Sequence, residues 1–394
     1  MTSVLILTEP MDFHAFAVAE ALRRKGVDAV LWHGTDFPGR QRASVWVDES
    51  GFDLEISGAE IALRQPRFDT VWNRRPTDPV LPGHLHPADR VPAGRDCQHF
   101  VWALWHLIAP DAFWVNPLSP VASAILKPYQ LRLAREIGLE IPPTLCSNDP
   151  ERIVEFLRAH EGETLYKSFH AGSWKTEDGL AILYTSPVTE DDLPEDAALQ
   201  AAPGIFQVRI PKDHELRVTF LGAQAVAARL HTQANPETRE DWRRSASLEV
   251  EPAALPEAVA RQCRELMARL GLVFGCFDFI VTPEGRHVFL EVNPMGQFLF
   301  LERLCPEIPL LDRFCDFLIA RGVASPGNGV PAVRLRDVWE PAERAFLAAP
   351  EIHVPKPNKI IAEGGAAPSR GPTGSELPVL TGLSGSSEAM TRGS

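Results

Sequence analysis

Hydrophobic and polar positions alternate through the first part of the chain in the pattern of an α/β domain. A short apolar run over 4–8 precedes an amphipathic segment over 13–25, which Gly26 ends, and a second apolar run covers 29–33. This spacing predicts a strand, a helix and a second strand parallel to the first. The connection after the first strand lacks a Gly-x-Gly-x-x-Gly fingerprint, so we expect no dinucleotide site there.

The middle of the chain predicts shorter elements separated by breaks. The expected helices cover 97–108, 121–137 and 151–160, and the expected strands cover 69–72, 113–115, 164–168 and 180–184. Between the last two strands, the polar stretch 170–179 has a glycine near each end. It is expected to be a loop, which either folds over phosphates as a lid or simply connects two strands.

The second half of the chain predicts antiparallel strands and two helices. The expected strands cover 205–210, 216–220, 225–230, 275–281 and 287–294, and the helices cover 257–270 and 310–321. From about residue 364 onward Gly, Ser, Pro and Thr dominate, so we expect 364–394 to be disordered.

Composition narrows the class of protein. The 394 residues are 45% hydrophobic, enough for two or three domains or one large composite domain. The formal charge of −13 argues against a nucleic-acid or anionic-membrane binder, since either needs a basic face. The chain begins without a basic, apolar targeting segment, and its six cysteines show no C-x-x-C spacing. These features favour a cytoplasmic location for the protein, in which its cysteines are reduced.

The predicted hairpin near the end of the folded part holds the clearest candidate chemistry. If Glu284 and Gly285 form a two-residue loop, Asp278 lies directly opposite Glu291, and Asn293 lies two residues on, on the same face. Facing carboxylates repel each other, and a bound cation reverses that repulsion. Oxygen ligands without His or Cys suit Mg²⁺. The alternative is a solvent-facing hairpin whose acids never meet.

Four charged residues lie on or beside predicted strands and helices. Glu215 and Arg217 share a strand face, so one can accept from a sugar hydroxyl while the other donates to a phosphate or an oxyanion; a surface ion pair is the alternative. Lys167 lies in an otherwise apolar strand, and Lys127 either opens or interrupts a helix. Either lysine alone is more simply explained as a surface residue.

Further arginines and histidines each allow a functional and a purely structural interpretation. Arg74 and Arg75 follow the strand over 69–72, where open α/β sheets bind ligands, and can hold a carboxylate or phosphate unless the loop is simply exposed. Asp241-Trp242-Arg243-Arg244 is either part of a site or a set of solvated charges. For His84 and His86 we favour a loop over a zinc site, because no Cys or acidic ligand pattern lies nearby.

The order of these motifs resembles that of the ATP-grasp carboxylate–amine ligases. The ordered set is Lys127, Lys167, the glycine-bounded loop, Phe206-Gln207-Val208, Glu215-x-Arg217, Asp241-Trp242-Arg243, Asp278 and Glu291-x-Asn293-Pro294. Within that superfamily, three further stretches closely resemble the microviridin-type graspetide ligases, relatives of RimK-like enzymes. They are Asn73-Arg74-Arg75-Pro76, the segment 184–189 and the segment 290–297.

The resemblance implies an α/β ATP-grasp fold of several parts. It implies a pre-ATP-grasp parallel-sheet domain over 1–115, a linker helix and central α+β lid domain over 116–204, a C-terminal antiparallel-sheet domain over 205–322, an extension over 323–363 and a disordered tail over 364–394. The resemblance itself covers roughly 1–322.

The resemblance also implies a role for each site residue. Contacts to ATP are implied for Lys127 and Lys167 (phosphates), Gln207 and Val208 (adenine) and Glu215 (ribose). The implied Mg²⁺ ligands are Asp278, Glu291 and Asn293. Arg217 and Arg243 are implied to act where the γ-phosphate meets the substrate carboxylate.

The implied reaction is ATP-dependent macrocyclisation of a ribosomal precursor peptide, with a leader and an acidic core. An Asp or Glu side chain becomes an acyl phosphate, and a Ser or Thr hydroxyl or a Lys amine displaces the phosphate to form an ω-ester or ω-amide. A homodimer is a family-level expectation, and the acidic stretch 190–196 is a candidate for a leader arginine. The alternatives are a ligase acting on a small molecule or protein terminus, and a non-catalytic nucleotide-binding protein.

Overall fold

The computed structural model describes residues 2–169, 173–176, 179–182, 184–239, 241–244, 248–322 and 331–355. These residues divide between two compact units. The first draws on 1–142, 210–231 and 249–361, and the second on 143–209 and 232–248. The predicted disordered tail lies outside the described residues, as do parts of the predicted lid loop and of the extension over 323–363. No described helix is long and apolar enough to cross a membrane.

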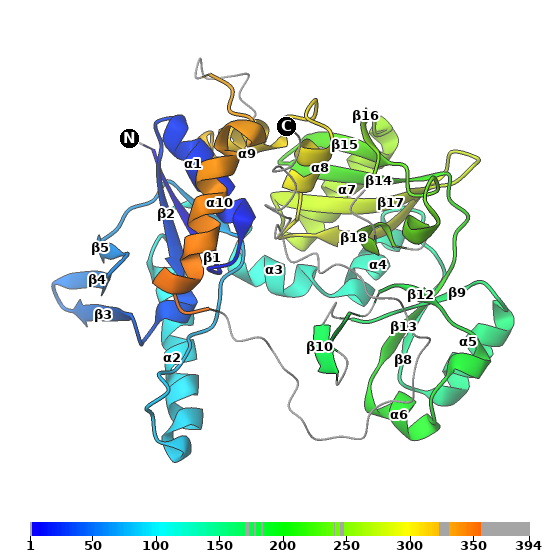
Figure 1. The fold of residues 1–394 in the computed structure, drawn as a ribbon, viewed down its shortest axis with the longest axis horizontal. Coiled ribbons are helices and arrows are strands. Elements are labelled where there is room, and N and C mark those ends of the chain that lie inside the picture. Colours follow the sequence, from blue (N-terminus) through cyan, green and yellow to red (C-terminus); the bar gives the residue numbers. More distant parts are fainter. Residues whose placement is uncertain are drawn as a thin grey trace, which may run out of the picture. The chain divides into compact units, whose positions relative to one another are not determined.

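A four-stranded parallel sheet begins the first unit, in the order β2-β1-β6-β7 (Figure 1). Its strands are β1 (Ser3–Thr8), β2 (Asp28–His33), β6 (Thr70–Asn73) and β7 (Phe113–Val115). Helix α1 (Phe13–Arg24) connects the first two, and the Asp12 side chain caps it by accepting from the His14 N–H. The predicted β-α-β start is therefore confirmed, because β1 and β2 pair in parallel along six residues.

A separate antiparallel sheet and a long helix follow β2, and the sequence did not predict the sheet. Its strands are β3 (Gln41–Asp48), β4 (Gly51–Gly58) and β5 (Ala62–Arg64). Helix α2 (Pro87–Leu107) begins ten residues before the predicted start, with Pro87 in its first turn. The ring of His86 accepts from the Ala88 N–H and so caps this helix. This contact agrees with a loop role for His86.

The predicted single helix over 121–137 is wrong. The structure has two helices there, α3 (Leu118–Ala124) and α4 (Lys127–Glu136). Pro128 lacks a backbone N–H and is tolerated only in the first turn of a helix. A new helix therefore begins at Lys127, with Leu126 extended before it.

A five-stranded antiparallel sheet forms the second half of the first unit, in the order β16-β15-β14-β17-β18. The strands are β14 (His214–Leu221), β15 (Gln224–Leu230), β16 (Val250–Ala253), β17 (Phe274–Val281) and β18 (His287–Asn293). Helix α7 (Glu257–Leu270) packs its apolar stripe into a core that contains Phe220, Phe277 and Phe289, all fully buried. Gly271 ends α7 at φ 68°, a left-handed conformation that glycine adopts without strain.

The β17–β18 hairpin has the predicted pairing at the site but not at the turn. Asp278 does lie opposite Glu291, as predicted. Near the turn, however, Val281 pairs with His287, one residue out of the predicted register, because a three-residue loop ends at Gly285 with φ 81°. A register shift beside Asp278 leaves Leu290 without an opposite residue and restores the predicted pairing.

Three helices complete the described part of the first unit. They are α8 (Leu299–Leu304), α9 (Leu310–Ile319) and α10 (Leu335–Ile352). Helix α10 was not predicted, and it packs against α1, where the rings of Phe13 and Trp339 lie 4.7 Å apart. Beyond its end, the His353 ring pairs with Asp36 at 2.7 Å.

The second unit is built on an antiparallel sheet in the order β12-β9-β13-β8. Its elements are β8 (Thr144–Ser147), α5 (Pro150–Ala159), β9 (Thr164–Lys167), β12 (Ser186–Pro187), α6 (Asp196–Ala201) and β13 (Gly204–Val208). A short antiparallel pair, β10 (Ser173–Thr176) and β11 (Gly179–Ile182), lies within the segment predicted as a loop and strand. Strand β13 pairs with β8 and β9, not with the strands that follow it in sequence.

Candidate functional site

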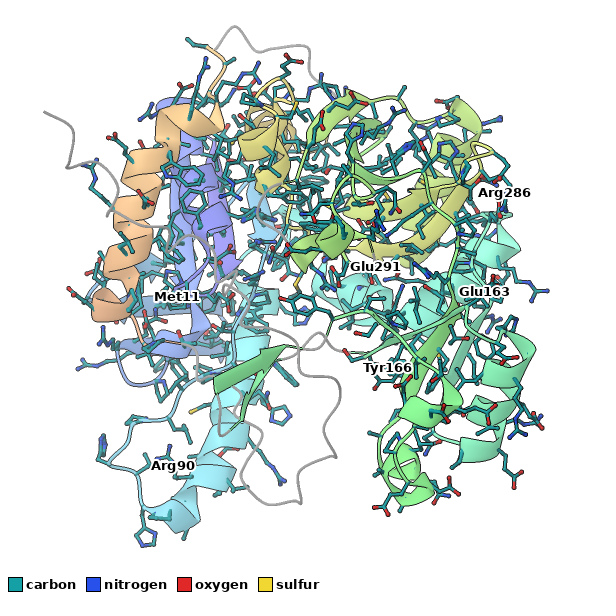
Figure 2. All side chains as sticks on the ribbon, turned by 45° about the vertical axis from the view of Figure 1, so that its right-hand side comes forward. Met11, Arg90, Glu163, Tyr166, Arg286 and Glu291 are labelled. Carbon is teal, nitrogen blue, oxygen red and sulfur yellow. The ribbon has the colours of Figure 1, made fainter. Side chains whose placement is uncertain are left out.

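Four charged side chains gather where β14, β17 and β18 lie side by side. Arg217 is directly opposite Asp278 and forms an ion pair with it. Asp278 in turn is opposite Glu291, which Figure 2 labels. The Glu291 Oε2 lies 3.0 Å from the Lys127 Nζ. The order of charges is thus cation, carboxylate, carboxylate, cation. The interpretation in which the two acids never meet is wrong.

The burial of Arg217 shows that this is not a surface ion pair. Its side chain is 5% exposed, against 19% for Asp278. Burial alone would lower the pKa of Arg217, but the Asp278 carboxylate, with a smaller effect from Glu291, raises it well above its usual range. Within the described part of the chain, its buried Nε has no hydrogen-bond partner. Arg217 is therefore a fixed positive charge beside the paired carboxylates.

The Asn293 side chain organises the turn that follows β18. Its Oδ1 accepts from the Met295 N–H at 3.1 Å and from the Gly296 N–H at 2.9 Å. In the same segment, the Gln297 carbonyl accepts from Arg217 Nη2 at 3.3 Å. The turn thus joins Asn293 to Arg217 through backbone groups.

Arg74 holds this turn from the other side, a role that the sequence did not reveal. Its guanidinium is 1% exposed, donates from Nε to Asp12 Oδ2 at 2.8 Å and reaches the carbonyls of Met295 and Gly296. Asn116 adds a hydrogen bond of 2.8 Å to the Pro294 carbonyl. The exposed-loop interpretation is therefore wrong for Arg74, which binds a carboxylate of its own chain.

The groups around Arg74 have strongly shifted pKa values. Burial raises the pKa of Asp12, but the neighbouring Arg74 outweighs it and the net pKa is far below the usual range. Burial, with the nearby Arg74 charge, lowers the pKa of His14 to about 3. The neutral His14 Nε2 can therefore accept from the Phe298 and Leu299 N–H groups, each at 3.2 Å. Arg75 pairs separately with Glu9 at 2.5 Å.

Glu215 lies two residues before Arg217 on β14, as expected for residues sharing a strand face. Its side chain is 11% exposed, and its Oε1 is 2.6 Å from the Lys212 Nζ. Both residues of the predicted pair are thus buried, each with an oppositely charged neighbour.

The second unit contains Lys167, Gln207 and Val208. The Lys167 Nζ donates to Gln207 Oε1 at 2.6 Å, and Gln207 Nε2 donates to Thr144 Oγ1 at 2.9 Å. The predicted lysine and the predicted hinge glutamine are therefore in direct contact. Val208 ends β13, and its N–H donates to the Pro143 carbonyl at 2.9 Å.

Arg243, also in the second unit, is held by Asp241. Its Nε lies 2.7 Å from Asp241 Oδ1, and its backbone N–H donates to the same oxygen at 3.1 Å. Asp241 is 5% exposed; burial would raise its pKa, but the Arg243 hydrogen bond and charge lower it. The guanidinium lies 6.0 Å from the centre of the Tyr184 ring. The interpretation as freely solvated charges is wrong for Asp241.

The acidic stretch 190–196 makes contacts within the second unit. Both Glu190 oxygens accept from Arg158, each at 2.9 Å. Asp192 accepts from the Thr189 N–H at 2.9 Å and from its hydroxyl at 2.7 Å. Asp191, like these, is exposed.

The donor set on β17 and β18 fits a hard cation. Two carboxylates face each other and an amide oxygen follows, which are ligand types that Mg²⁺ prefers. No cluster of three or more His, Cys, Asp and Glu residues suited to a metal occurs among the described residues. A magnesium ion would therefore have few protein ligands and would complete its shell with other oxygen atoms.

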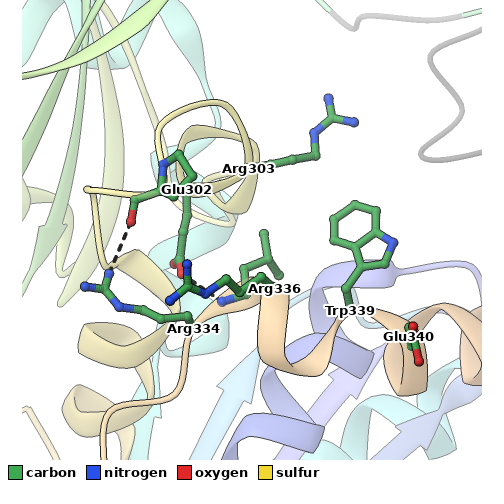
Figure 3. Close-up of a pocket in the computed structure, with 8 residues that line it drawn as sticks. Glu302, Arg303, Arg334, Arg336, Trp339 and Glu340 are labelled. Atoms are coloured by element: carbon green, nitrogen blue, oxygen red, sulfur yellow. Dashed lines mark hydrogen bonds between the residues drawn. The ribbon is translucent and has the colours of Figure 1, made fainter.

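A pocket of about 400 Å³ lies elsewhere in the first unit, where α8 meets the start of α10 (Figure 3). Its charged lining residues include Glu302, Arg303, Arg334 and Arg336. The Glu302 carboxylate is already satisfied, because it accepts from the Leu311 and Leu335 N–H groups. None of the predicted site residues lines this pocket.

Several solved structures resemble about four fifths of the chain. The macrocyclase MdnB of Microcystis aeruginosa MRC is 33% identical, with a TM-score of 0.68 over 81% of this chain and 99% of that one. The macrocyclase MdnC of the same organism, bound to its precursor peptide MdnA, is 28% identical, with a TM-score of 0.71 over 81% and 100%. The ATP-grasp ligase PsnB, with a phosphomimetic variant of its minimal precursor, Mg and ADP, is 25% identical, with a TM-score of 0.62 over 82% and 99%.

No model of a known protein family matches the chain, and no curated protein sequence matches it. The structural comparisons nevertheless define the class: the fold is that of the ATP-grasp ligases, which confirms the fold prediction. The chain belongs to the family of ATP-grasp ligases that includes the ribosomal-peptide macrocyclases MdnB and MdnC. About a fifth of the chain lies beyond the part that these relatives cover.

Proposed function

We propose that this protein uses ATP and Mg²⁺ to join acidic side chains of a ribosomal precursor peptide to hydroxyl or amine side chains of the same peptide. The observation that carries the proposal is the row of charges formed by Arg217, Asp278, Glu291 and Lys127. Relatives with bound precursor peptides, and one with Mg and ADP, support the same assignment.

We assign the nucleotide and metal contacts as follows. Asp278, Glu291 and Asn293 hold Mg²⁺, which neutralises the facing carboxylates and the phosphates of ATP. Contacts to ATP are assigned to Lys127 and Lys167 (phosphates), Gln207 and Val208 (adenine) and Glu215 (ribose). The assignment is supported by the paired carboxylates and by the contact between Lys167 and Gln207.

The proposed reaction has two steps. An Asp or Glu carboxylate oxygen of the peptide attacks the γ-phosphorus of ATP, and ADP leaves. A Ser or Thr hydroxyl, or a Lys amine, then attacks the acyl carbon; inorganic phosphate leaves, and the nucleophile loses its proton. The peptide thereby loses one water for each ω-ester or ω-amide formed.

Two arginines are proposed to act on the reacting atoms. Arg217, a buried charge with a raised pKa, stabilises the oxyanion of the tetrahedral intermediate. Arg243 contacts the substrate carboxylate or the transferred phosphoryl group. No covalent enzyme nucleophile is needed, because positioning and charge neutralisation carry the chemistry.

We also propose that the chain has the three domains and the extension expected from its sequence. The pre-ATP-grasp, central and C-terminal domains are assigned to 1–115, 116–204 and 205–322, followed by an extension over 323–363. We also propose the cytoplasm as the compartment, supported by six cysteines without C-x-x-C spacing.

The test is the mass of a candidate acidic precursor peptide after incubation with the protein, ATP and Mg²⁺. The proposal expects a loss of one water per bond with the native protein. It expects the same loss with Arg229→Ala, because Arg229 is a half-buried arginine of the same sheet that pairs with Glu251. It expects no loss with Arg217→Ala. A mass gain that matches an added amine would instead indicate a ligase that acts on a small second substrate.

A further inference from the structure

The pocket between α8 and the start of α10 is lined by arginines from two separate parts of the chain. Arg303 belongs to α8, while Arg334 and Arg336 lie at the start of α10, and Trp339 and Glu340 follow one turn later (Figure 3). Helix α10 lies beyond 1–322, the part of the chain that resembles the ATP-grasp ligases. None of the residues assigned above to ATP or Mg²⁺ lines this pocket. The pocket is therefore a candidate for a second binding site.

Hydrogen bonds hold the walls of this pocket in place. The Glu302 carboxylate, which is 3% exposed, accepts from the Leu311 N–H at 2.7 Å and from the Leu335 N–H at 2.8 Å. The Arg334 Nη1 donates to the Pro306 carbonyl at 3.4 Å. These contacts tie the start of α10 to α8 and α9. The pocket is thus preformed, and its volume of about 400 Å³ lies in the range of small-molecule sites.

Two of the three guanidinium groups are available to a ligand. Within the described residues, Arg303 forms no hydrogen bond or ion pair. The Arg336 side chain is 80% exposed and lies 3.8 Å from Asp337, a pair that solvent screens. Guanidinium groups bind phosphate oxygens through pairs of parallel hydrogen bonds. The lining has three arginines against two carboxylates, Glu302 and Glu340, so it favours an anion.

Trp339 and Glu340 add groups of a different kind to the lining. Trp339 is half-buried, and its ring packs against Phe13 with 4.7 Å between the ring centres. An indole ring fixed in this way is a surface on which a planar base can stack. Glu340 is exposed and forms no hydrogen bond or ion pair in the described part of the chain. Its carboxylate can therefore accept from an amino or hydroxyl group of a ligand.

We propose that this pocket binds a nucleoside monophosphate. Arg303 and Arg336 contact the phosphate, and the base packs against Trp339. Glu340 accepts from an amino group of the base or from a ribose hydroxyl. A monophosphate matches the lining better than a triphosphate, because its charge of about −2 is closer in size to the small positive charge of the lining. The nucleotide bound here is separate from the ATP that the proposed reaction consumes.

Hydrogen–deuterium exchange of the full chain, titrated with AMP and separately with GMP, tests this proposal. Amide protection at 302–306 and 334–340 reports on the pocket, while protection at 204–208 reports on the proposed ATP site. At least one of the two nucleotides should protect the pocket segments of the native protein. Its half-saturating concentration should rise at least about tenfold in Arg303→Ala and in Arg336→Ala, because each loses a charged hydrogen bond.

The matched control is Arg344→Ala, because Arg344 is an exposed arginine of the same helix outside the pocket. This variant should match the native protein. Absence of protection at the pocket segments with millimolar AMP and GMP, or equal half-saturating concentrations in all three variants, would overturn the proposal. The pocket and the proposed ATP site are measured on different segments and without peptide. Failure of this proposal is therefore distinguishable from failure of the proposed function.

Fragments of the nucleotide test the two halves of the pocket. Adenosine lacks the phosphate, and ribose 5-phosphate lacks the base. Each should require at least about a tenfold higher concentration than AMP for half-saturation of the pocket segments, because each loses one group of contacts. Equal protection by adenosine would contradict the phosphate contact with Arg303 and Arg336. Equal protection by ribose 5-phosphate would contradict the base contact with Trp339.

Discussion

Arg217 and Asp278 lie opposite each other on adjacent strands and form a largely buried ion pair. Asp278 faces Glu291 on its other side, so one carboxylate belongs both to the ion pair and to the proposed Mg²⁺ site. Arg217 lowers the negative charge that the two acids present, and its own burial keeps it in place. Binding of Mg²⁺ and release of nucleotide should therefore depend on Arg217 as well as on the acids.

Asp278→Asn should destabilise the first unit more than Glu291→Gln does. Loss of the Asp278 charge leaves Arg217, which is 5% exposed, without its counter-ion, at an expected cost of about 3–5 kcal/mol in the free energy of unfolding. Glu291 and Lys127 are 34% and 31% exposed, so solvent screens that pair and the expected cost is about 1 kcal/mol or less. Chemical denaturation measures both values, and equal costs would contradict the account.

Arg74→Lys should slow ligation without unfolding the protein. Lysine keeps the charge beside Asp12, but its single ammonium cannot also hold the carbonyls of Met295 and Gly296. The turn after Asn293 should then loosen, and the turnover rate should fall on the order of tenfold or more. The matched control is Arg75→Lys, which alters a separate pair with Glu9.

The readout for Arg74 is the dependence of ATP turnover on Mg²⁺ concentration. A positioning role predicts a higher half-saturating Mg²⁺ concentration in Arg74→Lys, with melting temperature close to that of the native protein. An unchanged Mg²⁺ dependence in Arg74→Lys, or an equal effect of Arg75→Lys, would contradict the positioning role assigned to Arg74.

His14 should make stability depend on pH below about 6.5. Its pKa is about 3 in the folded protein, against 6.5 when unperturbed, so the unfolded chain binds the proton more tightly. Stability should therefore fall as the pH decreases from about 6.5 toward 3, and this loss is absent above 6.5. His14→Gln supplies a neutral acceptor for the same N–H groups, so its melting temperature should fall less between pH 7 and pH 5.

His33 has its pKa lowered to about 4, chiefly by burial, and contributes to the same pH range. The quantity to compare is therefore the difference in melting temperature between the native protein and His14→Gln at each pH. Parallel melting curves across this range would contradict the role assigned to His14.

Charge reversal in the acidic stretch should weaken peptide binding if the stretch meets a leader arginine. The expected result for Asp191→Lys is weaker binding of a labelled leader peptide with unchanged ATP binding, measured by fluorescence anisotropy and calorimetry. Glu190→Lys also breaks the ion pair between Glu190 and Arg158. Its effect therefore includes a change in local structure and is less specific than that of Asp191→Lys. Unchanged leader affinity in Asp191→Lys would remove this assignment.

The sequence predicted the pairing of Asp278 with Glu291 correctly, because two departures of the β17–β18 hairpin from the predicted register cancel each other. The three-residue turn at Gly285 shifts the register by one residue, and the bulge at Leu290 shifts it back before Asp278. A bulge depends on contacts across strands, so composition alone does not reveal it. The partners of the two acids, Arg217 and Lys127, are distant in sequence and were found only in the folded chain.

The sequence did not predict helix α10 or strand β3, because residues within each of them obscure its hydrophobic pattern. Helix α10 has buried residues at helical spacing, Leu335, Val338, Ala342 and Phe346, but Pro341 and Pro350 within it disguised the pattern. Strand β3 contains two adjacent exposed apolar residues, Trp46 and Val47, which break the expected alternation of apolar and polar positions. Arg74 was singled out by its place after a strand, but its contacts depend on long-range packing.

Transfer of oxygen-18 from the peptide to phosphate tests the central claim most directly. A precursor whose Asp and Glu side-chain carboxylates carry oxygen-18 is incubated with the protein, ATP and Mg²⁺, and the released phosphate is analysed by mass spectrometry. The account predicts one oxygen-18 atom in phosphate for each water lost by the peptide, and none with Arg217→Ala. Release of unlabelled phosphate during ring formation would contradict an acyl phosphate intermediate and with it the proposed mechanism.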